Sequence, residues 1–451
     1  MSNQQIDIWD AKYNLSYDEA IEPDSPFFLD ISSGRGEFRI KTLYRQLHID
    51  VNKGQLRRPP RKDYTLFTGH RGCGKSTELS RVATYLHDRE RYFVIHLDCV
   101  KRLDIDNLNY SDVLLALATR LLEALEEEHS ISVEPVHLHN LENWFAERVE
   151  THTDIKDYAA EIKAGAKGKT GLPWLAELFA ELTSRINIGT TYRNQLRQVL
   201  TNNFSEFSKA FNQLIRVAED KIREKQLGAR ILFTVDGTDR LNSEDAHKFF
   251  IEDSHQLTQI DSIFIYCAPI HLLHTNGSHL NANFNSPFRV PMIKVRDPQN
   301  RPIEENYELM RQLTYRRVPN YLFSDIAVLD KLIRYSGGHP RDLFRLLNIS
   351  INHTEGDLID ALSSDKAIKE VAYDYRRTIT KDEYKLLVEI DQNPDTPEPY
   401  TSETSRDMLY DLVLLEYNNY FWKSHPTIET LPGYQKALSE SLGKPANLPS
   451  T

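Results

Sequence analysis

Runs of apolar residues alternate with amphipathic segments along roughly the first 300 residues of the chain. The runs are continuous and do not alternate between apolar and polar positions, which is typical of strands in a parallel sheet covered on both faces. Helical spacing of apolar residues in the intervening segments predicts the covering helices. We therefore expect an α/β core whose five strands lie within residues 64–68, 92–99, 228–241, 262–269 and 291–295.

Helical patterns outside these strands define the predicted domains. Residues about 130–225 form a helical insertion ahead of the third strand, and the helices after residue 300 are broken at Gly337 and Gly338. Near the C-terminus, two helices followed by a turn between aromatic strands indicate a winged helix. The expected domains are an N-terminal arm at 1–63, a core at 64–300, a helical lid at 301–375 and a winged helix at 376–451.

One short helix of the insertion carries an apolar face. It starts at Pro173 and includes Trp174, and a small, basic segment precedes it. Packing within the insertion is the simpler interpretation of such a stripe. Binding of a partner protein, a neighbouring subunit or a membrane surface is the alternative.

A glycine-rich turn joins the first strand to the next helix. It reads G-x-x-x-x-G-K-S from Gly69, which is the phosphate-binding loop in its required context of a strand before and a helix after. Glycines let the backbone turn its N–H groups toward phosphate oxygens, Lys75 brings a positive charge to the β- and γ-phosphates, and the Ser76 hydroxyl is a ligand for Mg²⁺. The helix N-terminus also favours anions. The candidate nucleotide-binding residues are Gly69, His70, Arg71, Gly72, Cys73, Gly74, Lys75, Ser76 and Thr77.

Two carboxylates follow the third strand. Asp236 ends the run ILFTVD, and a carboxylate at the C-terminal end of a strand beside a phosphate-binding loop is where Mg²⁺ is held, usually through water. Asp236 is therefore predicted to share the metal with Ser76. Asp239, a little further on, is our candidate for the general base that orients the attacking water. Pairing of Asp239 with Arg240 is the structural alternative.

Composition narrows the class of protein. The 451 residues carry a net charge of -11, which speaks against a general electrostatic attraction to nucleic acid. The three cysteines lie in apolar segments and indicate a reducing compartment instead of a disulfide framework. No segment reaches the apolar length of about 18 residues that a membrane span needs, and the N-terminus is not typical of a signal peptide. We therefore expect a cytoplasmic protein.

Together these motifs resemble the AAA+ and STAND branch of P-loop ATPases, over about residues 35–435. The phosphate loop after the first strand and the acid after the third strand agree with that branch. The stretch SGGHPRDLFRLL resembles the start of the family's lid helix, which implies that Arg341 reads the γ-phosphate and that Pro340 packs near the nucleotide. VDGTDR resembles the D-G-x-D/E form of STAND proteins, and LLEYNNYFWKSHP resembles the winged helix attached to such ATPases. The resemblance implies Mg²⁺, ATP and hydrolysis of ATP to ADP and phosphate.

The sequence departs from the family pattern at three points. Gly237 follows Asp236 where most AAA+ enzymes have a glutamate, so we expect hydrolysis to be slow. The end of the fourth strand, around Cys267, offers no clear sensor residue. Arg289 lies where AAA+ arginine fingers fall, which implies a contact with nucleotide bound by a neighbouring subunit. A plain surface arginine at a strand start is the alternative for Arg289.

Three functions fit this combination of motifs. The first is a molecular switch in which the state of the nucleotide sets the angle of the lid and controls homo-oligomer assembly or a separate effector protein, as in STAND signalling or conflict-response ATPases. The second is an initiator-type ATPase whose winged helix binds DNA. Acidic residues outnumber basic ones beyond Arg376, which weakens this second function because phosphate contacts normally need Lys and Arg. The third is a scaffold that binds ATP and does not hydrolyse it.

Overall fold

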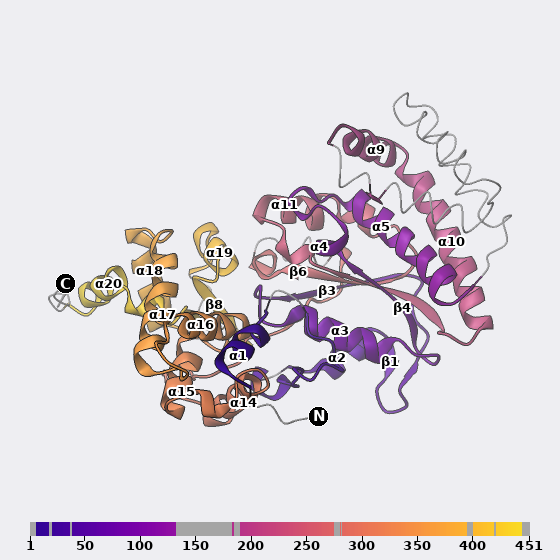
Figure 1. The fold of residues 1–451 in the computed structure, drawn as a ribbon. Helices are drawn as coiled ribbons and strands as arrows, with labels where there is room; N and C mark the ends of the chain where they lie inside the picture. The colour runs from indigo at the N-terminus through magenta and orange to yellow at the C-terminus, as the bar shows by residue number, and fades with distance from the viewer. Residues whose placement is uncertain are drawn as a thin grey trace.

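Five parallel strands form the central sheet of the molecule, on the right in Figure 1. From one edge to the other they are β4 Tyr92–Asp98, β5 Arg230–Asp236, β6 Ile263–Pro269, β3 Asp63–Gly69 and β7 Phe288–Arg289, and every neighbouring pair is parallel. The phosphate loop follows β3, which comes first of these in the chain, and Asp236 ends β5, which comes third. The predicted α/β core with a five-stranded parallel sheet is confirmed, and it is the fold that the resemblance to AAA+ and STAND ATPases implies.

This computed structural model describes residues 6–17, 20–36, 38–131, 183–184, 190–274, 280, 282–394, 400–418 and 421–443. The predicted helix with Pro173 and Trp174 lies outside these ranges. Within them, no helix is long and apolar enough to cross a membrane.

The fifth strand differs from the prediction, which had it at 291–295. It is the two-residue strand β7, and Val290 adds one more hydrogen bond, from its N–H to the Thr68 carbonyl oxygen at 2.7 Å. Pro291 has no N–H to continue the ladder, so the pairing ends there. The apolar residues Ile293 and Val295, which suggested a strand, are buried in the core of the helical lid instead.

Helices cover both faces of the sheet (Figure 1). On one face, α5 (Tyr110–Glu123) and α10 (Phe204–Glu224) pack on side chains of β4, β5 and β6. On the other face lie α2 (Ile40–Gln46) and α3 (Lys75–Leu86), with Leu79, Val82 and Leu86 buried against the strands. The shorter elements of this part are β1 Ile49–Asp50, β2 Gln55–Leu56, α4 Cys99–Arg102, α11 Ser243–His247 and α12 Ser254–Leu257.

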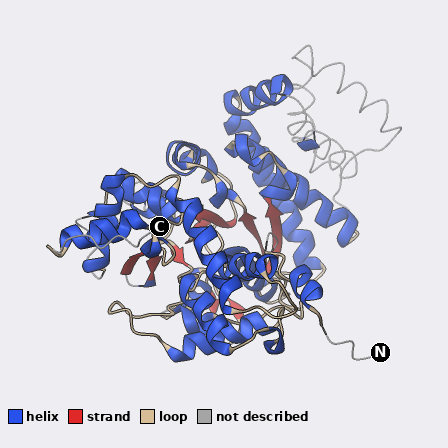
Figure 2. Ribbon diagram, turned by 60° about the vertical axis from the view of Figure 1, so that its left-hand side comes forward, coloured by secondary structure: helices blue, strands red, loops and turns tan. Residues whose placement is uncertain are grey.

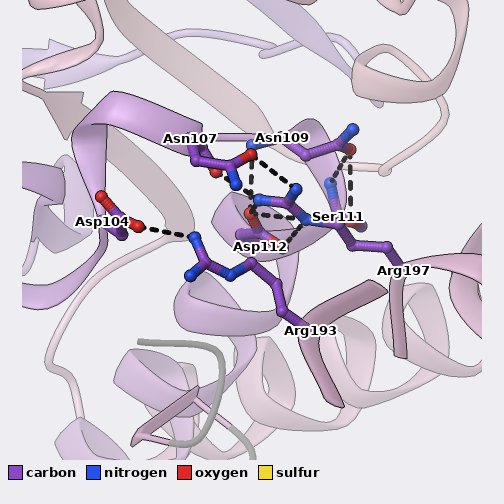
Figure 3. A network of polar contacts seen from close by, with 7 residues as sticks. All are labelled: Asp104, Asn107, Asn109, Ser111, Asp112, Arg193 and Arg197. Atoms are coloured by element: carbon purple, nitrogen blue, oxygen red, sulfur yellow. Dashed lines mark hydrogen bonds and ion pairs between the residues drawn. The ribbon is translucent and has the colours of Figure 1, made fainter. Parts of the chain in front are cut away.

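The described part of the insertion is tied to the core by two arginines of α9 (Thr190–Asn202), as Figure 3 shows. Arg193 donates to the Asp104 carboxylate at 2.6 Å. Arg197 donates to the Asp112 carboxylate at 3.1 Å and to the Asn107 side chain at 2.9 Å. These charge-assisted bonds fix α9 against the start of α5, on the far side of the sheet from the phosphate loop's helix α3.

A helical unit with its own apolar core follows the sheet. It contains α14 (Glu304–Tyr315), α15 (Ile326–Tyr335), α16 (Pro340–His353) and α17 (Ala361–Arg376). The predicted break at Gly337 and Gly338 lies between α15 and α16, where both glycines have positive φ. The first helix of the chain, α1 (Ile8–Asn14), contributes Ile8 and Ala11 to the same core. The N-terminal arm therefore packs on the lid as well as on the ATPase core.

The C-terminal region has a third core and the element order that we predicted for a winged helix. Helices α18 (Lys381–Gln392) and α19 (Glu403–Tyr410) precede an antiparallel hairpin of β8 (Leu414–Tyr417) and β9 (Phe421–Ser424), and α20 (Pro432–Ser441) follows. Figure 2 shows the strands enclosed by helices. The side chains of β8 divide between two cores: Leu414 lies in the C-terminal core, and Leu415 lies against the face of the sheet that carries α3. The hairpin is thus held directly beside the ATPase core.

Candidate nucleotide-binding site

The phosphate loop has the backbone conformation that its glycines were expected to allow. Gly72 and Gly74 have φ of +92° and +95°, and Gly74 caps the N-terminus of α3. A Cβ atom on Gly72 would lie 2.7 Å from the His339 ring and 2.9 Å from Cβ of Arg341. Gly72 therefore serves both the turn and the close approach of the lid, because any side chain there would push the start of α16 away.

Lys75, the lysine of the loop, is buried and forms an ion pair. Its Nζ lies 2.8 Å from the Asp239 carboxylate and donates to the carbonyl oxygens of Gly69 at 2.9 Å and His70 at 2.8 Å. Burial, the largest single influence, lowers the pKa of Lys75, but the charge and the hydrogen bond of Asp239, with smaller contributions from Cys73 and Cys267, together raise this pKa above its ordinary value. Protein oxygens thus occupy the donors that a phosphate would use.

The two predicted acids lie together at the end of β5. Burial, and then the charge of Asp239, raises the pKa of Asp236 above its ordinary value. Burial also opposes ionisation of Asp239, but Lys75 outweighs it and the pKa of Asp239 lies below its ordinary value. The ion pair of Asp239 is with Lys75, and the charge of Arg240 has a weaker effect on the same carboxylate. Asp236 and Ser76 line the same cleft, as the predicted metal site requires.

A cleft of about 330 Å³ lies over the loop, between the core, the lid and the arm. Among its described lining residues, six carry a positive side chain and four a negative one, although the chain as a whole is strongly acidic. Such a surplus favours an anionic ligand. The positive residues are Arg71, Lys75, Lys101, Arg240, Arg317 and Arg341, and the negative ones are Glu22, Asp98, Asp236 and Asp239.

The structure brings the two lid residues into this cleft. Pro340 is the first residue of α16 and Arg341 the second, and both line the cleft opposite the loop. Nε of Arg341 is buried and has no hydrogen-bond partner among the described residues. Burial, with Arg71 and Arg240 close by, lowers the pKa of Arg341. An anion between these side chains would give Nε of Arg341 a partner and would counter the lowering of the Arg341 pKa.

Arg289 does not reach the cleft of its own chain. It lines a separate cavity of about 740 Å³ between β7 and the C-terminal hairpin, and Nη1 lies 3.4 Å from the Glu416 carboxylate. Glu416 also bonds His274 and accepts from Nε1 of Trp422 at 3.0 Å. A role for Arg289 toward a neighbouring subunit stays a prediction.

Sequence reasoning missed two hydrogen bonds that hold the phosphate loop to distant segments. Nε2 of His70 accepts from the backbone N–H of Glu416 at 2.6 Å, and Nε2 of His339 contacts the Arg71 carbonyl oxygen at 2.8 Å. The lid is in turn joined to the hairpin, because the buried Asp342 carboxylate lies 3.0 Å from His339 and 3.1 Å from His425. No local pattern in the sequence signals these contacts.

The buried His70 predicts a pH dependence of stability. Burial lowers the pKa of His70 to about 3, so the folded protein keeps this histidine neutral. Below the ordinary pKa of about 6.5, the unfolded chain binds a proton that the folded chain excludes, and stability falls as pH falls. This one group contributes a slope of about 1.4 kcal/mol per pH unit between its two pKa values. Gln in place of His70 keeps an acceptor for the Glu416 N–H and does not titrate.

The measurement is urea unfolding at about pH 7 and about pH 5.5, the range in which histidine protonation changes. We expect His70→Gln to lose less stability than wild type over this interval. His255→Gln, at an exposed histidine, is the control and should follow wild type. Equal losses in wild type and His70→Gln would show that His70 is protonated in the folded state.

The N-terminal arm closes one side of the cleft. The backbone N–H of Ile21 donates to the Thr77 hydroxyl at 3.1 Å, next to the loop lysine. Arg35 of the arm lies behind the loop: it is 1% exposed, donates to the Cys73 carbonyl oxygen at 2.8 Å and pairs with Glu78. Arg35 therefore supports the loop from below and does not line the cleft.

Comparisons with known proteins give structural likeness at low similarity. No family model matches the chain, and no curated protein matches it. A Walker-type ATPase of Pyrococcus abyssi has a TM-score of 0.37 and 13% identity, covering 90% of this chain and 99% of that chain. The Orc1 protein of Aeropyrum pernix in complex with DNA has a TM-score of 0.35 and 11% identity, covering 96% of each chain. Cdc6p of Pyrobaculum aerophilum has a TM-score of 0.34 and 11% identity, covering 94% of this chain and 100% of that chain. We transfer no residue role from these three structures.

Proposed function

We propose that this protein is a Mg²⁺-dependent ATP switch that hydrolyses ATP slowly. The observation that carries the proposal is the cleft of about 330 Å³, because the phosphate loop, both acids of β5 and the lid residues Pro340 and Arg341 line it together. Ligand pockets usually enclose about 300–1,000 Å³, so the volume suits a nucleotide. The switch would act on assembly with further copies of the chain or on a separate effector protein, as in the STAND ATPases that it resembles.

The residues present fit Mg²⁺ and ATP. Ser76 and Asp236 offer the oxygen ligands that Mg²⁺ prefers, with phosphate and water completing its shell. Mg²⁺ would neutralise charge on the β- and γ-phosphates. Nε of Arg341, which has no hydrogen-bond partner among the residues described, gives the lid a donor for a phosphate oxygen. The three cysteines are buried free thiols, which agrees with the cytoplasm as the proposed compartment.

The hydrogen bonds of the phosphate loop supply the coupling that a switch needs. His70 is bonded to the C-terminal hairpin through Glu416, and Arg71 is bonded to the lid through His339. A ligand shifts a conformational equilibrium only through different contacts in the two states. Phosphates drawn into the loop would alter the backbone that these two bonds hold, and so favour one arrangement of lid and hairpin over another.

Slow hydrolysis follows from the chemistry around Asp236. Gly237 supplies no side chain where a glutamate would act as base; its φ is +86°, and a Cβ atom there would lie 2.8 Å from the Val100 side chain. Asp239 is the second carboxylate at the end of β5, and it is held by Lys75. We propose that Asp239 is the general base and that it becomes available when Lys75 exchanges it for phosphate.

The switch is tested with Arg341→Ala. We expect this variant to bind ADP as wild type does and to lose the change in shape or assembly that ATP produces, because its γ-phosphate contact is gone. The measurement is small-angle scattering of wild type and variant with ADP and with a non-hydrolysable ATP analogue. Arg345→Ala is the matched control, since Arg345 lies one turn later on α16, outside the cleft, and pairs with Asp374. An Arg341→Ala protein that responds as wild type does, or a wild type that responds to neither nucleotide, would refute the switch.

A further inference from the structure

A second arginine of the lid, Arg317, has an environment unlike that of the other buried arginines. It follows α14, is 2% exposed and lines the cleft with Arg341. Its guanidinium carbon lies 4.4 Å from the ring centre of Phe344 on α16 and 5.1 Å from that of Phe27 in the arm. The two rings hold the flat guanidinium between the arm and the lid by cation–π contacts.

The charge of Arg317 lacks a carboxylate partner among the described residues. Nη1 donates to the Phe27 carbonyl oxygen at 3.3 Å, and Nε is buried with no hydrogen-bond partner in the part of the chain that the structure describes. Arg311, on the same stretch of chain, has the carboxylate partners that a buried arginine usually has. They are Asp330 at 2.7 Å, Glu304 at 2.9 Å and Glu308 at 3.2 Å. The other arginines buried among the described residues, Arg35 and Arg193, also have a carboxylate within 4 Å.

An unpaired buried charge is costly, and proteins normally compensate it with a partner. Burial lowers the pKa of Arg317 to about 10, so at neutral pH the group still carries its charge. Since no described acid compensates this charge and the side chain faces a cleft with a surplus of positive groups, the missing partner is an anion that enters the cleft. The guanidinium has further N–H groups to donate to such an anion.

We infer that Arg317 is a phosphate-binding residue of the cleft, which pairs with a phosphate group of the bound nucleotide and fastens the arm and the lid onto it. This inference rests on the proposed function, because the nucleotide supplies the phosphate. Arg317 then acts beside Arg341 and from a different element. The contact with Phe27 extends the response to the N-terminal arm.

The test is calorimetric binding of ATP, ADP and adenosine to wild type, Arg317→Met and Arg316→Met. Methionine keeps much of the length and apolar contact of Arg317 and removes its charge. We expect ATP and ADP to bind Arg317→Met about 10- to 100-fold more weakly, the range for loss of a charged hydrogen bond, while adenosine affinity stays unchanged. Arg316→Met is the matched control, because Arg316 is exposed and bonds the neighbouring arm carbonyl of Pro26 at 3.2 Å.

Thermal unfolding without nucleotide separates ligand binding from a structural role. Removal of an unpaired buried charge should leave the melting temperature of Arg317→Met unchanged or raise it, whereas loss of a structural clamp would lower it. If Arg317→Met does not fold, Arg317→Lys provides the same comparison, since Lys keeps the charge but not the planar fork. Wild type that binds no nucleotide would defeat the proposed function. Two results would overturn only this inference. The first is equal ATP affinity of wild type and the Arg317 variant, and the second is a loss of adenosine affinity in the variant as large as its loss of ATP affinity.

Discussion

Replacing Lys75 by alanine is expected to weaken ATP binding by at least about 100-fold, since the lysine of the phosphate loop brings its charge to the β- and γ-phosphates. In the structure this charge is held by Asp239 at 2.8 Å and by two loop carbonyl oxygens. ATP therefore has to compete with an existing buried ion pair for Lys75. The measurement is calorimetric titration with Mg-ATP.

Lys75→Ala also leaves Asp239 buried without its partner, which by itself destabilises a fold. The double variant Lys75→Ala with Asp239→Asn removes both charges and separates lost binding from lost folding. Lys53→Ala, at an exposed lysine outside the loop and the cleft lining, is the control. If a folded Lys75→Ala protein bound ATP as wild type does, the nucleotide would have to lie elsewhere and the assignment of the cleft would be wrong.

Asp239→Asn is expected to lower the rate of ATP hydrolysis by about 10²–10⁴-fold, the usual effect of removing a general base. ATP affinity should stay the same or increase, because asparagine no longer competes with phosphate for the Lys75 charge. This combination of slow turnover and undiminished binding is specific to a base that is also the resting partner of the lysine. Phosphate release and calorimetry on the same preparation measure the two quantities.

Glu244→Gln, an exposed carboxylate shortly after Asp239, is the control for hydrolysis and should turn over as wild type does. Wild-type turnover by Asp239→Asn would leave Asp239 with the structural role of neutralising Lys75. No turnover by wild type would favour the scaffold that binds ATP and does not hydrolyse it.

Features that depend on neighbouring residues were predictable from the sequence. The glycines of the phosphate loop encode positive φ, continuous apolar runs encode buried parallel strands, and Asp236 at a strand end encodes an acid beside the loop. The break before α16 and its start were predictable in the same way, from Gly337, Gly338 and Pro340. The error in the fifth strand has the same origin, since apolar Ile293 and Val295 look alike whether they enter a sheet or a helical core.

Contacts between distant segments were decided only by the tertiary structure. His70 and Glu416 are 346 positions apart, and no rule of spacing links a loop histidine to the backbone of a C-terminal hairpin. The sequence likewise gives no sign that Arg317 has no acidic partner within the described ranges while Arg311 has three, because both are arginines on an amphipathic stretch. Local chemistry determines what a residue is able to bind, but burial and packing of remote segments determine which partner it has, and whether a charge such as that of Arg317 is left for a ligand.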